Sequence, residues 1–293
     1  MTMRKKALII GVGTLGKGAA EVLAKNGYDL VVTNRKNEKA IASADAIQEK
    51  YSNITVRAFS VDVCDSNSID AFKKELESRC INGKEEFDIV LLTSGGNDNK
   101  AFFNMQREQR DVYNMPESPT NEFNEELHSK WSSWDADAMK SVYRANVSGP
   151  VELMYKLGYM LIAQEKAPTL ITVGSVSPDL SGVNHYAASK CSLLEETKRF
   201  SHHLAWDRRR RGVEAGKAVS IRWGFTDSEQ SKGLLIGEDG QPTFRGTEIL
   251  RATPAGKFGT PEEFGESILL IATSRVIGCE FIADGGFSDS PTV

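Results

Sequence analysis

The sequence is poor in the features that mark membrane, disulfide-rich and zinc-binding proteins. Its 293 residues contain no run of about 18 consecutive apolar residues, so no segment is predicted to cross a membrane as a helix. The four cysteines form no CxxC pair, and the four histidines form no HExxH motif. A disulfide framework and a metal site are therefore not expected. We interpret the cysteines as reduced thiols, which predicts a cytoplasmic protein.

The sequence also lacks an excess of positive charge. It has 36 lysines and arginines against 40 aspartates and glutamates, which gives a formal net charge of −4. Proteins that bind nucleic acid or anionic membranes usually carry a basic surface, so neither partner is expected. The 25 glycines and 9 prolines are an ordinary share, which excludes collagen-like and low-complexity chains. The chain is therefore expected to fold and to bind a small molecule.

Short apolar runs alternate with segments of helical periodicity, which is the pattern of a parallel sheet covered by helices. The first run follows basic residues as in a signal peptide, but it leads into a glycine-rich turn, so we interpret it as a strand. A helix is predicted over 66–80. The predicted strands are 7–10, 29–33, 54–61, 87–92, 169–173, 217–223 and 279–283. The pattern predicts a single α/β domain over residues 1–293, with a doubly wound parallel sheet and helices on both faces.

Residues 97–130 depart from this pattern because they are polar and poor in aliphatic side chains. They follow the carboxyl end of a predicted strand, which is the side on which such sheets bind ligands. We predict an insertion that walls or covers the active site. A surface loop or an oligomer contact is an equally open interpretation.

A glycine-rich turn joins the first predicted strand to the first predicted helix. Residues 11–16 read Gly-Val-Gly-Thr-Leu-Gly, and a second strand follows the helix. In a βαβ unit of the Rossmann type, such glycines allow close approach of a pyrophosphate to the amino end of the helix. The turn therefore predicts a dinucleotide site, and a glycine turn with a packing role only is the less favoured alternative.

The residues after the second strand indicate which dinucleotide binds. An NAD site usually has an acidic residue here for the ribose hydroxyls, whereas this chain has Asn34 followed by Arg35. Nothing there repels a 2′-phosphate, and the guanidinium of Arg35 suits one. We therefore favour NADP(H) over NAD(H). The alternative is a solvated basic loop.

Tyr186 and Lys190 lie four residues apart on the apolar stripe of a predicted helix, which continues through Leu193, Thr197, Phe200 and Leu204. A lysine on such a stripe is costly unless it has a polar role. A neighbouring cation favours the phenolate of a tyrosine, which suits proton transfer to a carbonyl oxygen. The pair predicts an acid–base site.

Two further polar residues fall at positions of interest. Ser175 follows the strand 169–173, at its carboxyl end, and its hydroxyl can polarise a carbonyl. Asn146 lies on an apolar stripe of a helix predicted over 137–160. Taken singly, each is as readily a turn residue or a satisfied core amide.

Together these residues resemble the short-chain dehydrogenase/reductase family over nearly the whole chain. Tyr186-Ala187-Ala188-Ser189-Lys190 matches its YxxxK motif, and Ser175 and Asn146 match its serine and asparagine. The resemblance implies that Tyr186 exchanges the proton, Ser175 orients the carbonyl, Lys190 contacts the tyrosine and the nicotinamide ribose, and Asn146 holds a relay water. It also implies a homodimer or homotetramer.

The resemblance extends to the cofactor contacts. Asp62-Val63 implies an adenine contact, Gly224 to Ser228 implies contacts to the nicotinamide end, and Lys257 to Glu263 and Asp284 to Gly286 resemble the carboxyl-terminal signature. The sequence departs from the family where Leu92-Thr93-Ser94-Gly95 replaces NNAG and where Trp223 replaces a proline. The predicted cofactor-binding residues are Gly11, Gly13, Thr14, Leu15, Gly16, Asn34, Arg35, Asp62, Val63, Ser94, Gly95, Tyr186, Lys190, Gly224, Thr226 and Ser228.

The substrate is less well defined by the sequence. Arg222 and Trp223 end a predicted strand, and Arg222 is a candidate clamp for a substrate carboxylate or phosphate, with a structural ion pair as the slightly favoured alternative. Gly95-Gly96-Asn97 and the polar insertion resemble reductases of sugar acids in the family. We predict an NADP(H)-dependent oxidoreductase acting on the carbonyl or secondary alcohol of a sugar, sugar acid or hydroxy acid.

Three other functions stay open. The run Arg208 to Arg211 is interpreted as cations at the end of a helix, but docking of an acyl carrier protein would make the protein a 3-oxoacyl reductase. A non-catalytic NADP(H)-binding regulator would not need the set Asn146, Ser175, Tyr186 and Lys190. An epimerase with tightly held NAD is disfavoured by Asn34-Arg35.

Overall fold

The computed structural model describes residues 4–80, 85–96, 135–176, 185–228, 231, 233, 235–274 and 279–290. Seven parallel strands form one sheet in the order β3-β2-β1-β4-β5-β6-β7. The strands are β1 (Lys6–Ile10), β2 (Asp29–Asn34), β3 (Val56–Ser60), β4 (Ile89–Leu92), β5 (Thr169–Val173), β6 (Lys217–Trp223) and β7 (Cys279–Ala283). The order reverses between β1 and β4, where doubly wound sheets bind ligands. The predicted α/β fold is confirmed.

The predicted strands differ from the observed ones mainly at their amino ends. The strands predicted over 54–61 and 87–92 begin two residues later, at Val56 and Ile89. Phe87 bonds through both its amide and its carbonyl to the side chain of Gln164, at 3.2 and 2.9 Å. The amide of Thr55 donates to the carboxylate of Asp29 at 2.9 Å. These apolar runs therefore begin in turns whose amides bond to side chains.

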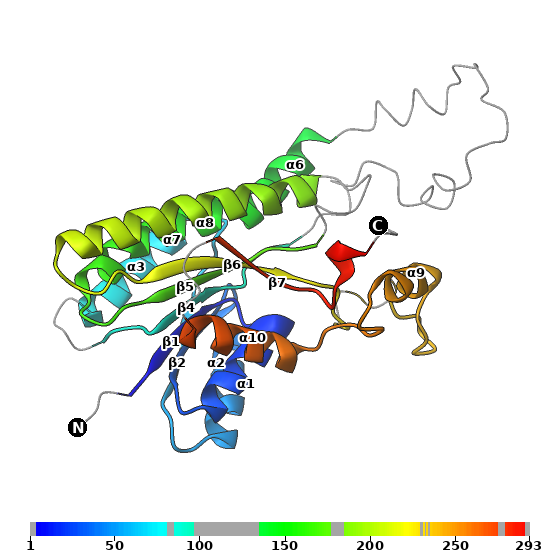
Figure 1. Ribbon diagram of the computed structural model, residues 1–293. Helices are drawn as coiled ribbons and strands as arrows, with labels where there is room; N and C mark the ends of the chain where they lie inside the picture. Colours follow the sequence, from blue (N-terminus) through cyan, green and yellow to red (C-terminus); the bar gives the residue numbers. More distant parts are fainter. Residues whose placement is uncertain are drawn as a thin grey trace, which may run out of the picture.

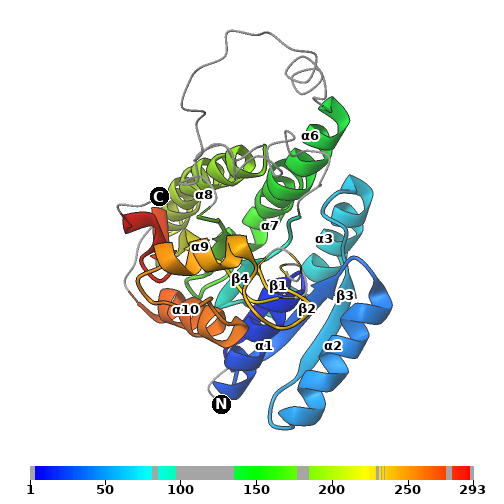
Figure 2. The ribbon, with the colours of Figure 1, turned by 90° about the vertical axis from the view of Figure 1, so that its right-hand side faces the viewer.

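Helices cover both faces of the sheet (Figures 1 and 2). One face carries α1 (Thr14–Lys25), α2 (Asn37–Lys50) and α10 (Pro261–Thr273). The other face carries α3 (Ser66–Cys80), α7 (Gly149–Ala163) and α8 (His185–Arg210). Because side chains alternate along a strand, Ala7 and Ile9 of β1 belong to one core, and Leu8 and Ile10 belong to the other. A further helix, α9 (Phe244–Ala252), lies beyond the carboxyl ends of the strands (Figure 1).

Helices α1 and α10 pack backbone to backbone. A Cβ atom built on Gly18 would lie 2.1 Å from the carbonyl oxygen of Pro261, and one on Gly265 would lie 2.7 Å from the carbonyl oxygen of Gly18. Thr260 and Glu263 form a capping box at the start of α10, where each side chain bonds to the backbone amide of the other residue. The two glycines therefore permit a contact that a larger residue would push apart.

The helix predicted over 137–160 is interrupted. The chain forms α6 (Ala136–Tyr143), a π-turn over Arg144–Ser148 and then α7. An unbroken α-helix would bond the carbonyl of Asn146 to the amide of residue 150, which is Pro150 and has no amide hydrogen. The prediction of one regular helix was wrong for this reason, and the interruption falls at a candidate site residue.

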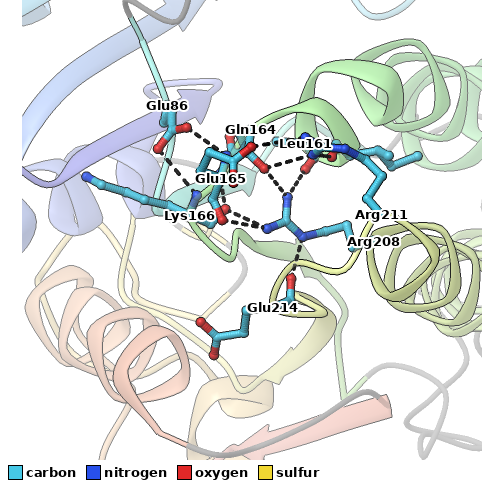
Figure 3. Close-up of polar contacts among 9 residues, drawn as sticks. Glu86, Leu161, Gln164, Glu165, Lys166, Arg208, Arg211 and Glu214 are labelled. Carbon is cyan, nitrogen blue, oxygen red and sulfur yellow. Dashed lines mark hydrogen bonds and ion pairs between the residues drawn. The ribbon is translucent and has the colours of Figure 1, made fainter.

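The arginine run at the end of α8 binds the end of α7 (Figure 3). Arg208 is fully buried, and its guanidinium donates to the carbonyls of Leu161 and Gln164 at 2.6 and 2.8 Å. Further bonds reach the carbonyls of Glu165, Lys166 and Glu214 at 3.0, 3.1 and 2.6 Å. Arg208 therefore satisfies backbone groups around the carboxyl end of α7, where the helix leaves its last carbonyls without intrahelical donors. The run is not a uniformly solvated basic surface.

Candidate active site

A cavity of about 680 Å³ lies at the carboxyl ends of the strands. It is lined by Gly11, Gly13, Thr14, Leu15, Gly16, Asn34, Arg35, Asp62, Val63, Ser94, Gly95, Tyr186, Gly224, Thr226 and Ser228, and by Ser175. Every predicted cofactor residue except Lys190 is in this set. The fold thus brings together residues that are up to 217 positions apart, from Gly11 to Ser228, in one cleft.

The glycine turn has the space that a dinucleotide requires. Gly11 adopts φ +98°, and a Cβ on Gly16 would lie 2.1 Å from the carbonyl oxygen of Gly11, so both positions require glycine. A Cβ on Gly13 would meet nothing within 4 Å, which leaves open space at the start of α1. No side chain caps the first turn of α1, and no acidic residue lies in it. The backbone amides of the first turn of α1 are therefore free of side-chain caps and suit the pyrophosphate of a dinucleotide.

The loop after β2 is held in place without using the charge of Arg35. The side chain of Asn34 accepts from the amide of Lys36 at 3.1 Å, and the hydroxyl of Ser60 donates to the carbonyl of Arg35 at 3.2 Å. Arg35 is exposed and lines the cavity, and within the described part of the chain no ion pair neutralises it. Its guanidinium is therefore available to an anionic group of a ligand.

Tyr186 and Lys190 lie on the first turns of α8 with the lysine ammonium 5.5 Å from the centre of the tyrosine ring. Burial raises the pKa of Tyr186, and a hydrogen bond with the Ser175 side chain acts in the opposite direction. Burial also lowers the pKa of Lys190 from 10.5 to about 8. The Lys190 ammonium donates to the carbonyl of Val173 at 2.9 Å. The predicted tyrosine, serine and lysine thus form one cluster at the ends of β5 and α8.

Asn146 is fully buried in the π-turn and joins three segments. Its side chain accepts from the amide of Gly96 at 2.9 Å and donates to the carbonyl of Gly96 at 2.8 Å. It also donates to the hydroxyl of Ser189 at 3.1 Å, and that hydroxyl donates to the carbonyl of Tyr186 at 2.6 Å. Asn146 therefore fixes the segment after β4 against the start of α8. Asn146 does not line the cavity, whereas the neighbouring Ala145 does.

Two substrate candidates are placed differently from one another. The guanidinium of Arg222 pairs with Glu280 of β7 at 2.9 Å, and Arg222 does not line the cavity. The structural ion pair, which was the alternative interpretation of the sequence, is thus the observed arrangement. Trp223 lines the cavity, but its indole nitrogen donates to the Thr226 hydroxyl at 2.6 Å.

Several residues of the site were not predicted. Ser189 is fully buried and lies inside the YxxxK motif. Its place three residues after Tyr186 is the feature of the sequence that could have identified it. Ser231 lines the cavity and bonds to the carbonyls of Thr226 and Ser228 at 2.7 and 2.9 Å. The hydroxyl oxygen of Ser94 is buried and has no partner among the described residues, which leaves a polar group for a ligand in the cleft.

The described residues show neither a metal-binding cluster nor a membrane-spanning helix. No group of three or more histidine, cysteine, aspartate or glutamate side chains there is arranged to hold a metal ion. In the same part of the chain, no helix is long and apolar enough to cross a membrane. The insertion predicted over 97–130 lies outside the described residues.

Comparison with known proteins shows what the chain is similar to. The model for short chain dehydrogenases matches residues 5–115. The uncharacterized oxidoreductase UxuB of Bacillus subtilis (strain 168) is 27% identical over 293 aligned residues, which cover 97% of this chain and 94% of that protein. The chain is thus similar to short-chain dehydrogenases in its amino-terminal part and to an oxidoreductase over nearly its whole length. These likenesses support an NAD(P)-dependent oxidoreductase, which is the class predicted from Tyr186 and Lys190.

Solved structures share the fold of this chain. A Haemophilus influenza protein assigned as a D-mannonate oxidoreductase, solved with bound NAD, has a TM-score of 0.74 at 24% identity and covers 99% of this chain and 96% of its own. A gluconate 5-dehydrogenase from Burkholderia cenocepacia J2315, solved with NADP and tartrate, has a TM-score of 0.74 at 20% identity, with 98% and 96% covered. Their likeness confirms the seven-stranded Rossmann-type architecture.

Proposed function

We propose that this protein transfers a hydride between NADP(H) and the carbonyl or secondary alcohol of a polar small molecule, with Tyr186 as the general acid and base. The observation that carries the proposal is the cluster of Tyr186, Ser175 and Lys190, in which Tyr186 and Ser175 line the same cavity as the glycine turn and Lys190 lies beside Tyr186. A binding protein without turnover would have no use for a tyrosine and a buried ammonium side by side.

Each residue of the cluster has a role that follows from its surroundings. The bound cofactor supplies or accepts the hydride at the substrate carbon. In the direction of reduction, the Tyr186 hydroxyl donates its proton to the carbonyl oxygen, and Ser175 donates a hydrogen bond that holds this oxygen. The Lys190 ammonium, 5.5 Å from the tyrosine ring, stabilises the phenolate that remains. Asn146 holds the segment after β4 against the start of α8. The resemblance to the family implies that Asn146 also holds a relay water.

The preference for NADP(H) is supported by the loop after β2. Asn34 carries no charge that repels a 2′-phosphate, and Arg35 lines the cavity with its guanidinium unpaired among the described residues. Of the two solved structures, one holds NAD and the other holds NADP, so this choice depends on the residues of the present chain.

A sugar acid or hydroxy acid is the substrate class that we favour. The solved relatives are assigned to D-mannonate and to gluconate, and the second also holds tartrate. The cavity lining includes Ser94, whose buried hydroxyl oxygen has no partner among the described residues, and such a group suits a polyhydroxylated ligand. Arg222 is not part of this proposal, because its guanidinium is paired with Glu280.

We also propose that the protein is a homodimer or homotetramer. Tyr155, Tyr159 and Trp206 are 43%, 67% and 65% exposed on the outer surfaces of α7 and α8. Exposed aromatic side chains are enriched at interfaces between subunits. Light scattering of the purified protein at micromolar concentration would reveal a monomer if this is wrong.

The catalytic role is tested by Tyr186→Phe. We expect kcat to fall by about 10²–10⁴-fold with a sugar-acid substrate, because the proton donor is lost, while the cofactor Kd stays the same. Tyr51→Phe, at the carboxyl end of α2 and outside the cavity lining, is the matched control and should behave as wild type. Retention of most of the activity by Tyr186→Phe would refute the assignment.

The cofactor preference is tested by fluorescence titration of NADPH and NADH. We expect tighter binding of NADPH, and we expect Arg35→Ala to remove the difference by weakening NADPH alone. Lys39→Ala changes an exposed cation of α2 nearby and should leave both Kd values unchanged. Tighter binding of NADH by the wild type would overturn the preference and favour the epimerase alternative.

A further inference from the structure

Trp223 is the last residue of β6 and stands where the family pattern has a proline. Its indole nitrogen donates to the hydroxyl oxygen of Thr226 at 2.6 Å. Both residues line the cavity at the carboxyl ends of the strands. The bond joins the end of a core strand to the loop that follows it, so it fixes a loop side chain to the rigid sheet.

The indole itself is held on several sides. Its ring packs edge-on against Phe264 of α10, with ring centres 5.2 Å apart and an interplanar angle of 79°. A Cβ on Gly259 would lie 2.7 Å from the Cζ2 atom of Trp223, so only glycine leaves room for the ring there. The amide of Gly259 donates to the carbonyl of Phe225 at 2.8 Å, so the segment that packs against the indole is bonded to the loop after β6. With 7% of its surface exposed, Trp223 has little freedom to move.

The chemistry of the two groups sets the direction of the Thr226 hydroxyl. An indole N–H only donates, so the Thr226 oxygen accepts this bond and must place its own hydrogen elsewhere. Among the described residues, no acceptor is recorded for that hydrogen. The Thr226 backbone is fixed in turn, because its carbonyl accepts from the Ser231 hydroxyl at 2.7 Å. The hydroxyl of Thr226 is therefore a fixed donor in the wall of the cavity.

The sheet order indicates what this donor meets. Arg35 follows β2 and Thr226 follows β6, and β1, β4 and β5 lie between those strands. Under the proposed function, the adenosine with its 2′-phosphate lies at Arg35, so the nicotinamide end extends toward β5, Tyr186 and β6. The nicotinamide carries a carboxamide oxygen, which is an acceptor.

We infer that Trp223 is a positioning residue that holds the Thr226 hydroxyl as a hydrogen-bond donor to the nicotinamide carboxamide. Its effect passes through Thr226, and the indole does not itself need to touch the substrate. The inference rests on the proposed function, because it requires a nicotinamide dinucleotide in the cavity.

The test is a double-mutant cycle with Trp223→Phe, which keeps an aromatic ring but removes the N–H, and Thr226→Val, which removes the hydroxyl. The Kd is measured for the reduced dinucleotide that the wild type binds more tightly, and for the matching ADP-ribose, which lacks only the nicotinamide. We expect each substitution to weaken dinucleotide binding by roughly three- to tenfold and to leave the ADP-ribose Kd unchanged. The double variant should be no weaker than Thr226→Val, because one residue acts through the other.

Thr226→Ser retains the hydroxyl and should bind the dinucleotide as the wild type does. Additive effects of Trp223→Phe and Thr226→Val, or an equal loss of ADP-ribose binding in Trp223→Phe, would overturn the inference and leave Trp223 a packing residue. Unchanged dinucleotide binding in both single variants would also overturn it, with the proposed function intact. If the wild type binds neither dinucleotide, the proposed function itself fails, and this inference fails with it.

Discussion

Replacing Arg208 with methionine should destabilise the protein strongly, although the residue lies far from the active site. The side chain is fully buried and donates five hydrogen bonds to backbone carbonyls, of which those to Leu161 and Gln164 are themselves buried. Methionine fills similar space but offers no donor. A buried carbonyl without a partner costs about 1–3 kcal/mol, so two of them predict a loss of roughly 2–6 kcal/mol in the free energy of unfolding.

The measurement is urea denaturation followed by circular dichroism, with the midpoint compared between variants. Arg209→Met and Arg210→Met are the matched controls, because both side chains are exposed in the same run and should change stability by less than about 0.5 kcal/mol. The KM and kcat of folded Arg208→Met should equal the wild-type values, since about 33 Å of helix separates Arg208 from Tyr186. A midpoint for Arg208→Met that matches the two controls would refute this account of the arginine run.

Three further predictions follow from single contacts. Gly18→Ala should lower the unfolding free energy by more than about 2 kcal/mol in the same assay, because its Cβ would lie 2.1 Å from the backbone of Pro261, whereas Gly13→Ala should leave stability nearly unchanged and weaken cofactor binding instead. Thr260→Ala should cost about 1 kcal/mol through loss of the capping box of α10, and a loss below 0.3 kcal/mol would contradict the role of the cap. Burial lowers the pKa of Lys190 from 10.5 to about 8. Below pH 8 the folded state therefore pays for burying a charged lysine. Between pH 8 and 10.5 the folded state has lost this proton while the unfolded state keeps it, so the penalty disappears. The unfolding free energy of the wild type should therefore rise by roughly 3 kcal/mol relative to Lys190→Met between pH 8 and 10.5, and equal pH profiles would contradict it.

Local patterns were sufficient for most of the fold. Strands of a parallel sheet are covered on both faces, so nearly every side chain of β5 and β6 is buried, and their observed ends are those predicted. The glycine turn likewise depends on its own residues, because the space at Gly13 and the contact of Gly16 with Gly11 lie within one turn. Such features are set by neighbours in sequence and are therefore visible in it.

Contacts between distant segments were not accessible in the same way. Arg222 appeared to be a candidate clamp because its partner, Glu280, lies 58 positions away on β7. The π-turn at Asn146 lies one turn before Pro150, which has no amide hydrogen, whereas the prediction of a helix over 137–160 followed the apolar stripe alone. The bond from Trp223 to Thr226 spans only three residues, yet the rotamers that create it are fixed by Phe264 and Gly259 from other segments.

Helix α8 shows how a buried cation can be assigned a role from its partners. The stripe that begins with Tyr186 and Lys190 continues at helical spacing to Arg208, so the rule that identified Lys190 as an unusual residue applies equally to Arg208. Both are buried, but Arg208 donates to five carbonyls, whereas Lys190 makes one hydrogen bond within the described part of the chain, to Val173. A cation whose donors are all matched by backbone contributes to stability. We propose that the remaining donors of Lys190, which lies beside Tyr186, serve a ligand. The opposite stability effects expected for Arg208→Met at neutral pH and for Lys190→Met below pH 8 follow from this difference in partners.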